Sequence, residues 1–251
     1  MEYQLTNNRL LKIIKDENAL NPRENEDCVS KIICFHKRYA IGDKHNYKHE
    51  DYSCWRDMEY SLTLCEDAKI ILPIYLMDHG DQSISLSPYG CKWDSGQVGF
   101  ILMSKKTINK EWGGDAFRAK RCLLAEFETY QNYFEGENYG FQVIDKNGDE
   151  EDSCWGFYGR AIFKSGIIEH LPKADQIFLA EQIFEKEKRL VESMTNEERE
   201  ELWKLLKSSN VCSNINYLIP QKKLAKLRFS KFCQKQKGTN CLIEAASQIL
   251  R

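Results

Sequence analysis

The chemically reactive side chains of this sequence are densest between Ile70 and Lys105. Asp78 and His79 stand together after an apolar run, and Cys91 and Asp94 follow in the next polar segment. An imidazole beside carboxylates can serve as a general base, and a nearby thiol can be the nucleophile of an acyl-transfer reaction. These four residues are therefore the candidate catalytic set of a hydrolase or nuclease. A plain turn is the simpler interpretation, because Asp, His and Gly are common where a strand reverses and no nucleophile signature surrounds Cys91.

A second group of residues has the side chains that bind zinc. Thiolates and imidazoles are the usual zinc ligands, and two of the histidines are four positions apart, as on one face of a helix. The weak candidate ligands are Cys34, His36, His45 and His49. Their spacing fits no closed zinc module, and none of the ten cysteines forms a CxxC pair, so a polar aromatic loop is the favoured interpretation. The sequence contains no glycine-rich phosphate loop, and it predicts no cofactor.

Charge is unevenly distributed along the chain. The whole sequence has 36 Lys and Arg against 38 Asp and Glu, whereas residues 171–251 have 15 against 10. The candidate partner-binding residues lie in this basic part of the chain: Lys222, Lys223, Lys226, Arg228, Lys231 and Lys235. Such a segment can contact phosphate groups or an acidic protein surface, although a charge run is most often a solvated helix face.

The composition is that of an ordinary globular protein, with 29% charged and 42% apolar residues. The apolar runs are far too short to cross a bilayer, and polar residues interrupt the N-terminal segment where a secretory signal needs an apolar centre. We therefore expect a cytoplasmic protein that has no membrane partner and whose cysteines are reduced thiols.

Apolar periodicity predicts the elements that must position these side chains. Strands are predicted over Val29–Phe35, Ile70–Leu76, Ser83–Leu86, Gln97–Met103, Tyr139–Ile144 and Ser153–Tyr158. Helices are predicted over residues 8–15, 116–134 and 174–194, the last with Ile177 facing inward. Residues 37–60 are expected to be a loop with at most one helical turn. Asn147-Gly148 marks a hairpin between the last two strands.

These elements predict an α+β fold in two parts. Residues 1–170 are expected to form a mostly antiparallel sheet body with a long helix, because turns connect several of the strands. Strand patterns stop near residue 170, so residues 171–251 are expected to be an all-helical C-terminal region. A capping box at Thr195–Glu198 and the proline at position 220 mark helix starts there.

Four strings of the sequence carry a resemblance to other proteins. They are CFHKRY at 34–39, LPIYLMDH at 72–79, WDSGQVGF at 93–100 and DSCWGFYG at 152–159. With them, the chain resembles a family of uncharacterised proteins carried by phages and other bacterial mobile elements, over residues 20 to 160 approximately. The family has no agreed activity, so the resemblance implies a bacterial host cytoplasm but assigns no catalytic residue.

Accessory proteins of mobile elements often disable host defence by occluding a nuclease complex. The resemblance therefore implies a non-enzymatic inhibitor of a host defence nuclease, of anti-CRISPR or anti-restriction type, that acts by binding. Its partner would be a host defence protein or ribonucleoprotein complex, with nucleic acid as a further partner through the basic C-terminal helices. Two alternatives remain open: a hydrolase or nuclease that uses the Asp78 set, and a nucleic-acid-binding accessory of replication or packaging.

Overall fold

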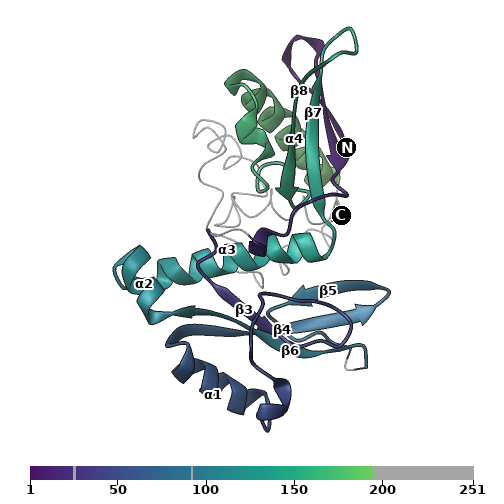
Figure 1. The fold of residues 1–251 in the computed structure, drawn as a ribbon. Coiled ribbons are helices and arrows are strands. Elements are labelled where there is room, and N and C mark those ends of the chain that lie inside the picture. The colour runs from purple at the N-terminus through teal and green to yellow at the C-terminus, as the bar shows by residue number, and fades with distance from the viewer. Residues whose placement is uncertain (25–26, 92, 194, 196–251) are drawn as a thin grey trace. The chain divides into compact units, whose positions relative to one another are not determined.

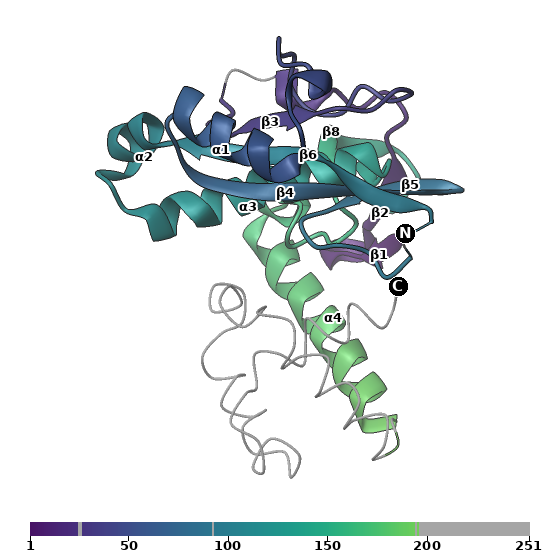
Figure 2. The same ribbon diagram turned by 90° about the horizontal axis from the view of Figure 1, so that it is seen from below.

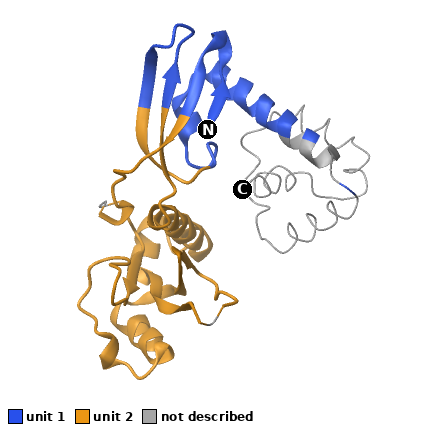
Figure 3. Ribbon diagram, turned by 90° about the vertical axis from the view of Figure 1, so that its right-hand side faces the viewer, with its two compact units in different colours: residues 1–12, 142–153, 161–251 blue, residues 13–141, 154–160 orange. Residues whose placement is uncertain are grey.

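The computed structural model describes residues 1–24, 27–91, 93–193 and 195. This part of the chain has a mixed fold, with four α-helices and two four-stranded sheets. The chain divides into two compact units (Figure 3). Unit 1 comprises the described parts of residues 1–12, 142–153 and 161–251, and unit 2 comprises those of residues 13–141 and 154–160.

The sheet of unit 2 is antiparallel throughout its recorded pairings. Its strands, in spatial order, are β3 (Lys31–Cys34), β6 (Ser95–Ser104), β4 (Ala68–His79) and β5 (Asp81–Ser85). A tight hairpin joins β4 to β5, because Gly80 adopts φ +81° and His79 pairs directly with Asp81. The four strands predicted in this part of the sequence, the turn at Gly80 and the mostly antiparallel pairing are confirmed.

Helices cover both faces of this sheet (Figure 1, Figure 2). The long helix α3 (Ala116–Phe134) begins where predicted, because the Asp115 carboxylate accepts the N–H groups of Phe117 and Arg118. Its buried side chains pack on one face of the sheet: Ala119, Leu123, Phe127 and Tyr130. On the other face, α1 (Trp55–Cys65) packs the side chains of Met58 and Leu62 against Ile33, Phe100 and Leu102. A short helix, α2 (Lys105–Trp112), follows β6 directly.

A β-bulge and one glycine shape the centre of this sheet. The register between β4 and β6 shifts between Ile74 and Tyr75, which leaves Val98 as the extra residue of β6. A Cβ atom on the neighbouring Gly99 would lie 2.0 Å from the carbonyl oxygen of Ile33. The WDSGQVGF string thus contains a position where only glycine allows β3 and β6 to approach each other.

The second sheet has the order β1, β2, β7, β8. Its strands are β1 (Glu2–Gln4), β2 (Leu10–Lys15), β7 (Asn138–Ile144) and β8 (Glu150–Tyr158), and the boundary between the units falls within the last three. The Asp145 carboxylate accepts the N–H groups of Asn147 and Asp149, each at 2.8 Å, and Gly148 has φ +96°. The predicted hairpin at Asn147-Gly148 is confirmed.

In unit 1, a buried carboxylate fixes the start of α4 (Lys173–Ser193). Asp175 accepts hydrogen bonds from the backbone N–H of Thr6 at 2.9 Å and from its hydroxyl at 2.7 Å, and Arg9 pairs with it at 2.5 Å. Arg9 also lies 3.3 Å from Glu151. Asp175 and Leu179 have no exposed surface, so both face inward from α4. The prediction that Ile177 faces inward is wrong, since 48% of it is exposed.

Two further predictions of secondary structure are wrong. The predicted helix over residues 8–15 is replaced by the end of the turn at Asn8 and by strand β2 from Leu10. In β2, Leu11 and Ile13 alternate with less buried neighbours, and Leu11 pairs with Tyr3 of β1. The pattern of two apolar pairs around Lys12 fits both periods, and pairing with β1 selects the strand. Residues 37–60 are not all loop, because α1 begins at Trp55. Only two side chains of α1 are buried, so the apolar stripe of this helix is weak.

Short 3₁₀ turns connect several of these elements. Three of them are η1 (Thr6–Asn8), η3 (His49–Asp51) and η4 (Ile167–His170).

The C-terminal region is described only in its first helix. α4 matches the predicted helix over 174–194 to within one residue at each end. The remaining predicted helices, including the capping box at Thr195–Glu198, extend beyond the described residues, so the all-helical C-terminal region is not confirmed. The division at residue 170 therefore stays a prediction.

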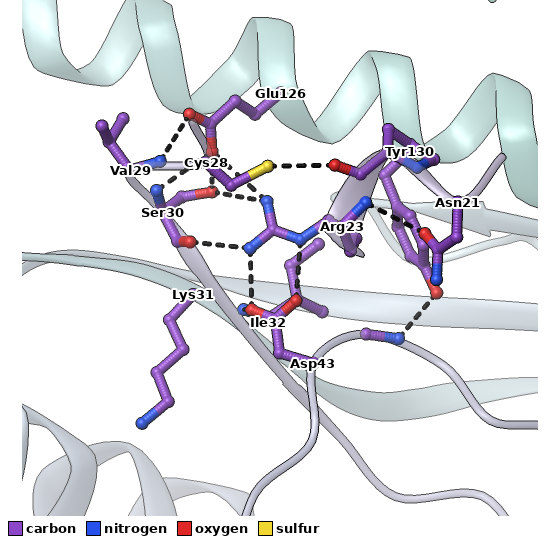
Figure 4. A network of polar contacts seen from close by, with 12 residues as sticks. Asn21, Arg23, Cys28, Val29, Ser30, Lys31, Ile32, Asp43, Glu126 and Tyr130 are labelled. Carbon is purple, nitrogen blue, oxygen red and sulfur yellow. Dashed lines mark hydrogen bonds and ion pairs between the residues drawn. The ribbon is translucent and has the colours of Figure 1, made fainter. Parts of the chain in front are cut away.

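A buried guanidinium group joins four segments of unit 2 (Figure 4). Arg23 belongs to the 3₁₀ turn η2 (Pro22–Glu24), and its side chain is 3% exposed. It donates to both carboxylate oxygens of Asp43, at 2.8 and 2.7 Å, and lies 3.3 Å from Glu126 of α3. It also donates to the carbonyl oxygen of Ser30 at 2.7 Å. Every polar edge of this cation therefore has an acceptor.

The two carboxylates of this network also hold the backbone that leads into β3. Glu126 accepts the N–H groups of Val29 and Ser30, at 2.9 and 3.0 Å. Asp43 accepts the N–H group of Ile32 at 2.8 Å. The network thus attaches β3 to α3 and to the segment around residue 43, which are far apart in the sequence.

Replacing Arg23 by alanine should destabilise the fold strongly. The change leaves two partly buried carboxylates without their cation, and breaking a buried pair in this way typically costs about 3–5 kcal/mol. Urea unfolding followed by circular dichroism measures this loss. Arg56→Ala, which removes an exposed arginine of α1, is the matched control and should change stability by less than about 0.5 kcal/mol. Equal unfolding midpoints for the two variants would contradict the assigned role of Arg23.

Candidate functional site

Three of the four candidate catalytic residues meet around one carboxylate at the start of β6. Asp94 Oδ2 lies 3.2 Å from His79 Nδ1 and 3.4 Å from Cys91 Sγ. Asp78 contributes only its backbone to this group, donating its N–H to the Asp94 carbonyl oxygen at 2.8 Å. Its carboxylate instead contacts Arg38 and accepts a hydrogen bond from the Tyr39 hydroxyl at 3.1 Å. The structure therefore separates the carboxylate of Asp78 from the other three side chains.

The order of these groups does not suit nucleophilic catalysis. An activated thiol needs the imidazole against its sulfur, with the carboxylate on the far side of the imidazole. Here Asp94 stands between the two groups, and within the described residues no hydrogen bond joins Cys91 to His79. The His79 side chain is also 78% exposed, so water surrounds it. The contacts of Asp94 therefore hold the loop between Cys91 and Ser95 in place, and they do not activate the Cys91 thiol.

The fastened loop carries a tryptophan that is almost fully exposed. Trp93 has 96% of its surface exposed, the highest value among the large apolar residues that the structure describes as exposed. Contacts between the residues before and after Trp93 hold the loop together. Asp94 contacts Cys91 and His79, and the Ser95 hydroxyl donates to the Cys91 carbonyl oxygen. The indole is therefore held on a short, internally bonded loop with no described protein surface covering it.

A groove of about 990 Å³ lies beside the edge strand β3, along residues 34–50. Its lining combines aromatic and imidazole rings with basic side chains. The rings are those of Phe35, His36, Tyr39, His45, Tyr47, His49 and Trp55, and the basic residues are Lys37, Arg38, Lys44 and Lys48. Asp43 and Glu50 are the carboxylates in the lining, and Asp43 is already paired with Arg23.

The four weak zinc candidates all line this groove, but they do not converge as ligands. His36 stacks on Tyr39, with ring centroids 4.8 Å apart, and His49 packs edge-on against Trp55 at 4.9 Å. His45 contacts the carbonyl oxygen of Cys34, not its sulfur, and burial raises the pKa of that thiol well above its usual range. No group of three or more His, Cys, Asp or Glu side chains in the described part of the chain could hold a metal ion.

The basic partner-binding candidates between Lys222 and Lys235 lie outside the described residues, so their role stays a prediction. The sequence favoured a core position for Trp93, which its 96% exposure shows to be wrong, and it did not identify the groove. The signals available were an indole inside a turn-like polar segment and the alternation of aromatic and basic residues in CFHKRY. Neither signal separates an exposed ring from a buried one, because burial depends on tertiary contacts.

Comparison of the chain with protein-family models, with curated proteins and with solved structures gives no match. None of the described helices combines the length and the apolar character that a membrane span requires. The resemblance to mobile-element proteins therefore stays an expectation.

The cysteines differ in reactivity in a way that tests this geometry. The backbone N–H of Asp57 and the hydroxyl of Ser53 stabilise the thiolate of exposed Cys54 and lower its pKa, whereas burial raises the pKa of Cys34. Because the thiolate is the nucleophile, iodoacetamide should label Cys54 of the native protein with a rate–pH midpoint below that of free cysteine. Cys34 should react only after unfolding. Peptide mapping by mass spectrometry measures both, and native labelling of Cys34 as fast as that of Cys54 would refute the assigned burial.

Proposed function

We propose that this protein acts by binding a protein partner, and that Trp93 is the anchor of the contact. The observation that carries this proposal is the 96% exposure of an indole on a loop that Asp94 and Ser95 fasten internally. Tryptophan is enriched among the few interface residues that carry most of the binding energy, since it buries a large area when a partner covers it. A loop that is already ordered loses little entropy on binding.

The class of partner follows from the resemblance stated above. Proteins of phages and mobile elements often act against host defence, and we propose a host defence nuclease complex of CRISPR or restriction type as the target. Binding, rather than catalysis, is the favoured mode because Asp94 separates Cys91 from His79.

The test uses the full chain against a panel of CRISPR and restriction nucleases. The wild-type protein should inhibit at least one complex at near-stoichiometric concentration, as a binder does. Trp93→Ala should weaken that inhibition by about thirtyfold, which corresponds to a hot-spot loss of about 2 kcal/mol. Phe117→Ala removes another exposed aromatic ring of unit 2, 74% exposed on α3, and should leave inhibition unchanged. If no nuclease of the panel is inhibited, the proposed target class fails.

His79→Ala separates binding from catalysis. A binder should keep its effect within about threefold, because His79 is a peripheral, exposed contact of Asp94. An enzyme that uses His79 as its base should lose roughly 100-fold or more of its rate while folding normally. Inhibition assays, with circular dichroism as the folding control, measure the difference, and a complete loss with an intact fold would favour the hydrolase alternative.

A further inference from the structure

We propose that the groove along residues 34–50 of unit 2 binds a nucleotide unit, with its phosphate on the lysines and its base against the rings. The ligand class is thus a phosphate with an adjacent base, supplied by a single nucleic-acid strand or by a free nucleotide. The volume of about 990 Å³ lies at the upper end of the range for small-ligand sites. This site is separate from the Trp93 contact and does not depend on it.

Unpaired positive charge in the groove supplies the phosphate half of this recognition. Lys37, Lys44 and Lys48 are exposed, and no hydrogen bond or ion pair engages the side-chain ammonium group of any of them among the described residues. Of the two carboxylates in the lining, Asp43 accepts both contacts from the buried guanidinium of Arg23, so little of its charge faces the groove. Glu50 is the other carboxylate, so three unpaired lysines face one exposed carboxylate and the lining keeps a net positive charge. An anion is the ligand that this charge favours.

A fourth cation of the groove, Arg38, is held in position. Arg38 contacts the Asp78 carboxylate and lies over the Tyr39 ring, 5.4 Å from its centroid, while 66% of its side chain stays exposed. Tyr39 is fixed in turn by its hydrogen bond to Asp78. Asp78, proposed from the sequence as a catalytic residue, is thus a positioning residue for two groove side chains. An ordered, exposed guanidinium suits phosphate, which accepts two of its N–H groups at once.

Packed rings supply the base half. The ring centroid of Trp55 lies 4.9 Å from that of His49 and 6.4 Å from that of Phe35. The centroids of Phe35 and His45 are 4.8 Å apart, so the rings pack on one another. Aromatic platforms beside basic groups are the usual means by which proteins hold single-stranded nucleic acid without reading its sequence. A stacked duplex offers no free base face, so this lining favours a single strand or a free nucleotide.

Two imidazoles offer hydrogen-bonding groups to such a ligand. His36 Nδ1 faces the backbone N–H groups of Arg38 and Tyr39, at 3.4 and 3.3 Å, so in the neutral ring the proton is on Nε2, which can donate. His45 Nε2 lies 2.9 Å from the Cys34 carbonyl oxygen, which only accepts, so His45 Nδ1 is an acceptor. That atom is buried and has no partner within the described residues, and a donor on a bound ligand would satisfy it.

The test measures binding of a fluorescein-labelled oligothymidylate of about ten nucleotides to the full chain by fluorescence anisotropy. The double variant Lys44→Ala/Lys48→Ala removes two unpaired groove cations. It should weaken binding about tenfold and lower the slope of log affinity against log salt by about 1.4, since each contact to a single strand contributes about 0.7. The control Lys106→Ala/Lys120→Ala removes two exposed lysines from α2 and α3, with the same change in net charge, and should bind like wild type. Equal losses in both variants would mean that net charge alone drives binding, which would overturn the site.

Further arms locate the site and identify the ligand class. Lys222→Ala/Lys223→Ala/Lys226→Ala tests the basic C-terminal segment; a loss confined to this variant would move the interaction out of the groove. Polyphosphate of matching charge should bind about tenfold more weakly than the oligonucleotide, because it has no bases to stack. If polyphosphate or polyglutamate binds as tightly as the oligonucleotide, the groove recognises any polyanion, and the assignment to a nucleotide is refuted. If thymidine monophosphate competes at a concentration similar to that at which unlabelled oligothymidylate competes, the ligand of the groove is a free nucleotide. If only unlabelled oligothymidylate competes, the ligand is a nucleic-acid strand.

Trp93→Ala keeps this inference distinguishable from the proposed function. The groove should bind oligothymidylate in that variant as it does in wild type, whatever happens to nuclease inhibition. Conversely, Lys44→Ala/Lys48→Ala leaves the Trp93 loop intact. If the Trp93 variant loses oligonucleotide binding as completely as the groove variant does, the two surfaces are one and the separate nucleotide site is refuted.

Discussion

The buried guanidinium of Arg23 is the interaction on which unit 2 depends. Taking a cation out of water is costly unless acceptors surround it, and here Asp43, Glu126 and the Ser30 carbonyl group do so. The consequence reaches the groove, because Asp43 follows Gly42, whose N–H donates to the Tyr130 hydroxyl of α3 at 2.6 Å. One end of the groove segment is therefore anchored to the core. The same pairing neutralises Asp43, which leaves the field of the groove lysines positive.

Local patterns predicted the elements whose signals are strong in short windows. Turn residues and apolar runs indicated the hairpins at Gly80 and Asn147-Gly148, and helical spacing of apolar residues indicated α3. Proline is rare in interior strands, because it has no N–H group to donate. Pro73 lies opposite Phe100 of β6, and the pairing of β4 with β5 begins only at Tyr75, so the other side of β4 is an edge at this position. β2 was missed because its partner strand, rather than its own pattern, decides its conformation.

The candidate site was predictable in its residues but not in their roles. The sequence placed His79, Cys91 and Asp94 in one candidate set with Asp78, and the structure brings these three side chains together but places the carboxylate of Asp78 elsewhere. Whether a carboxylate lies between two groups or behind one of them is a matter of a few ångströms in side-chain placement, which no spacing encodes. The exposure of Trp93 and the unpaired state of the groove lysines are likewise tertiary properties, because they record contacts that other segments do not make.

Asp78 connects the two proposed binding surfaces of unit 2. Its backbone N–H holds the loop of Trp93 through Asp94, and its carboxylate holds Arg38 and Tyr39 at the groove. This geometry gives Asp78 a structural role at the end of β4: it orders groups on both surfaces. It also makes the two proposals physically compatible on one unit. A protein anchored to a nuclease by Trp93 could at the same time bind a nucleotide in its own groove. It would then compete for the nucleic-acid substrate of the nuclease and also cover the surface of that nuclease.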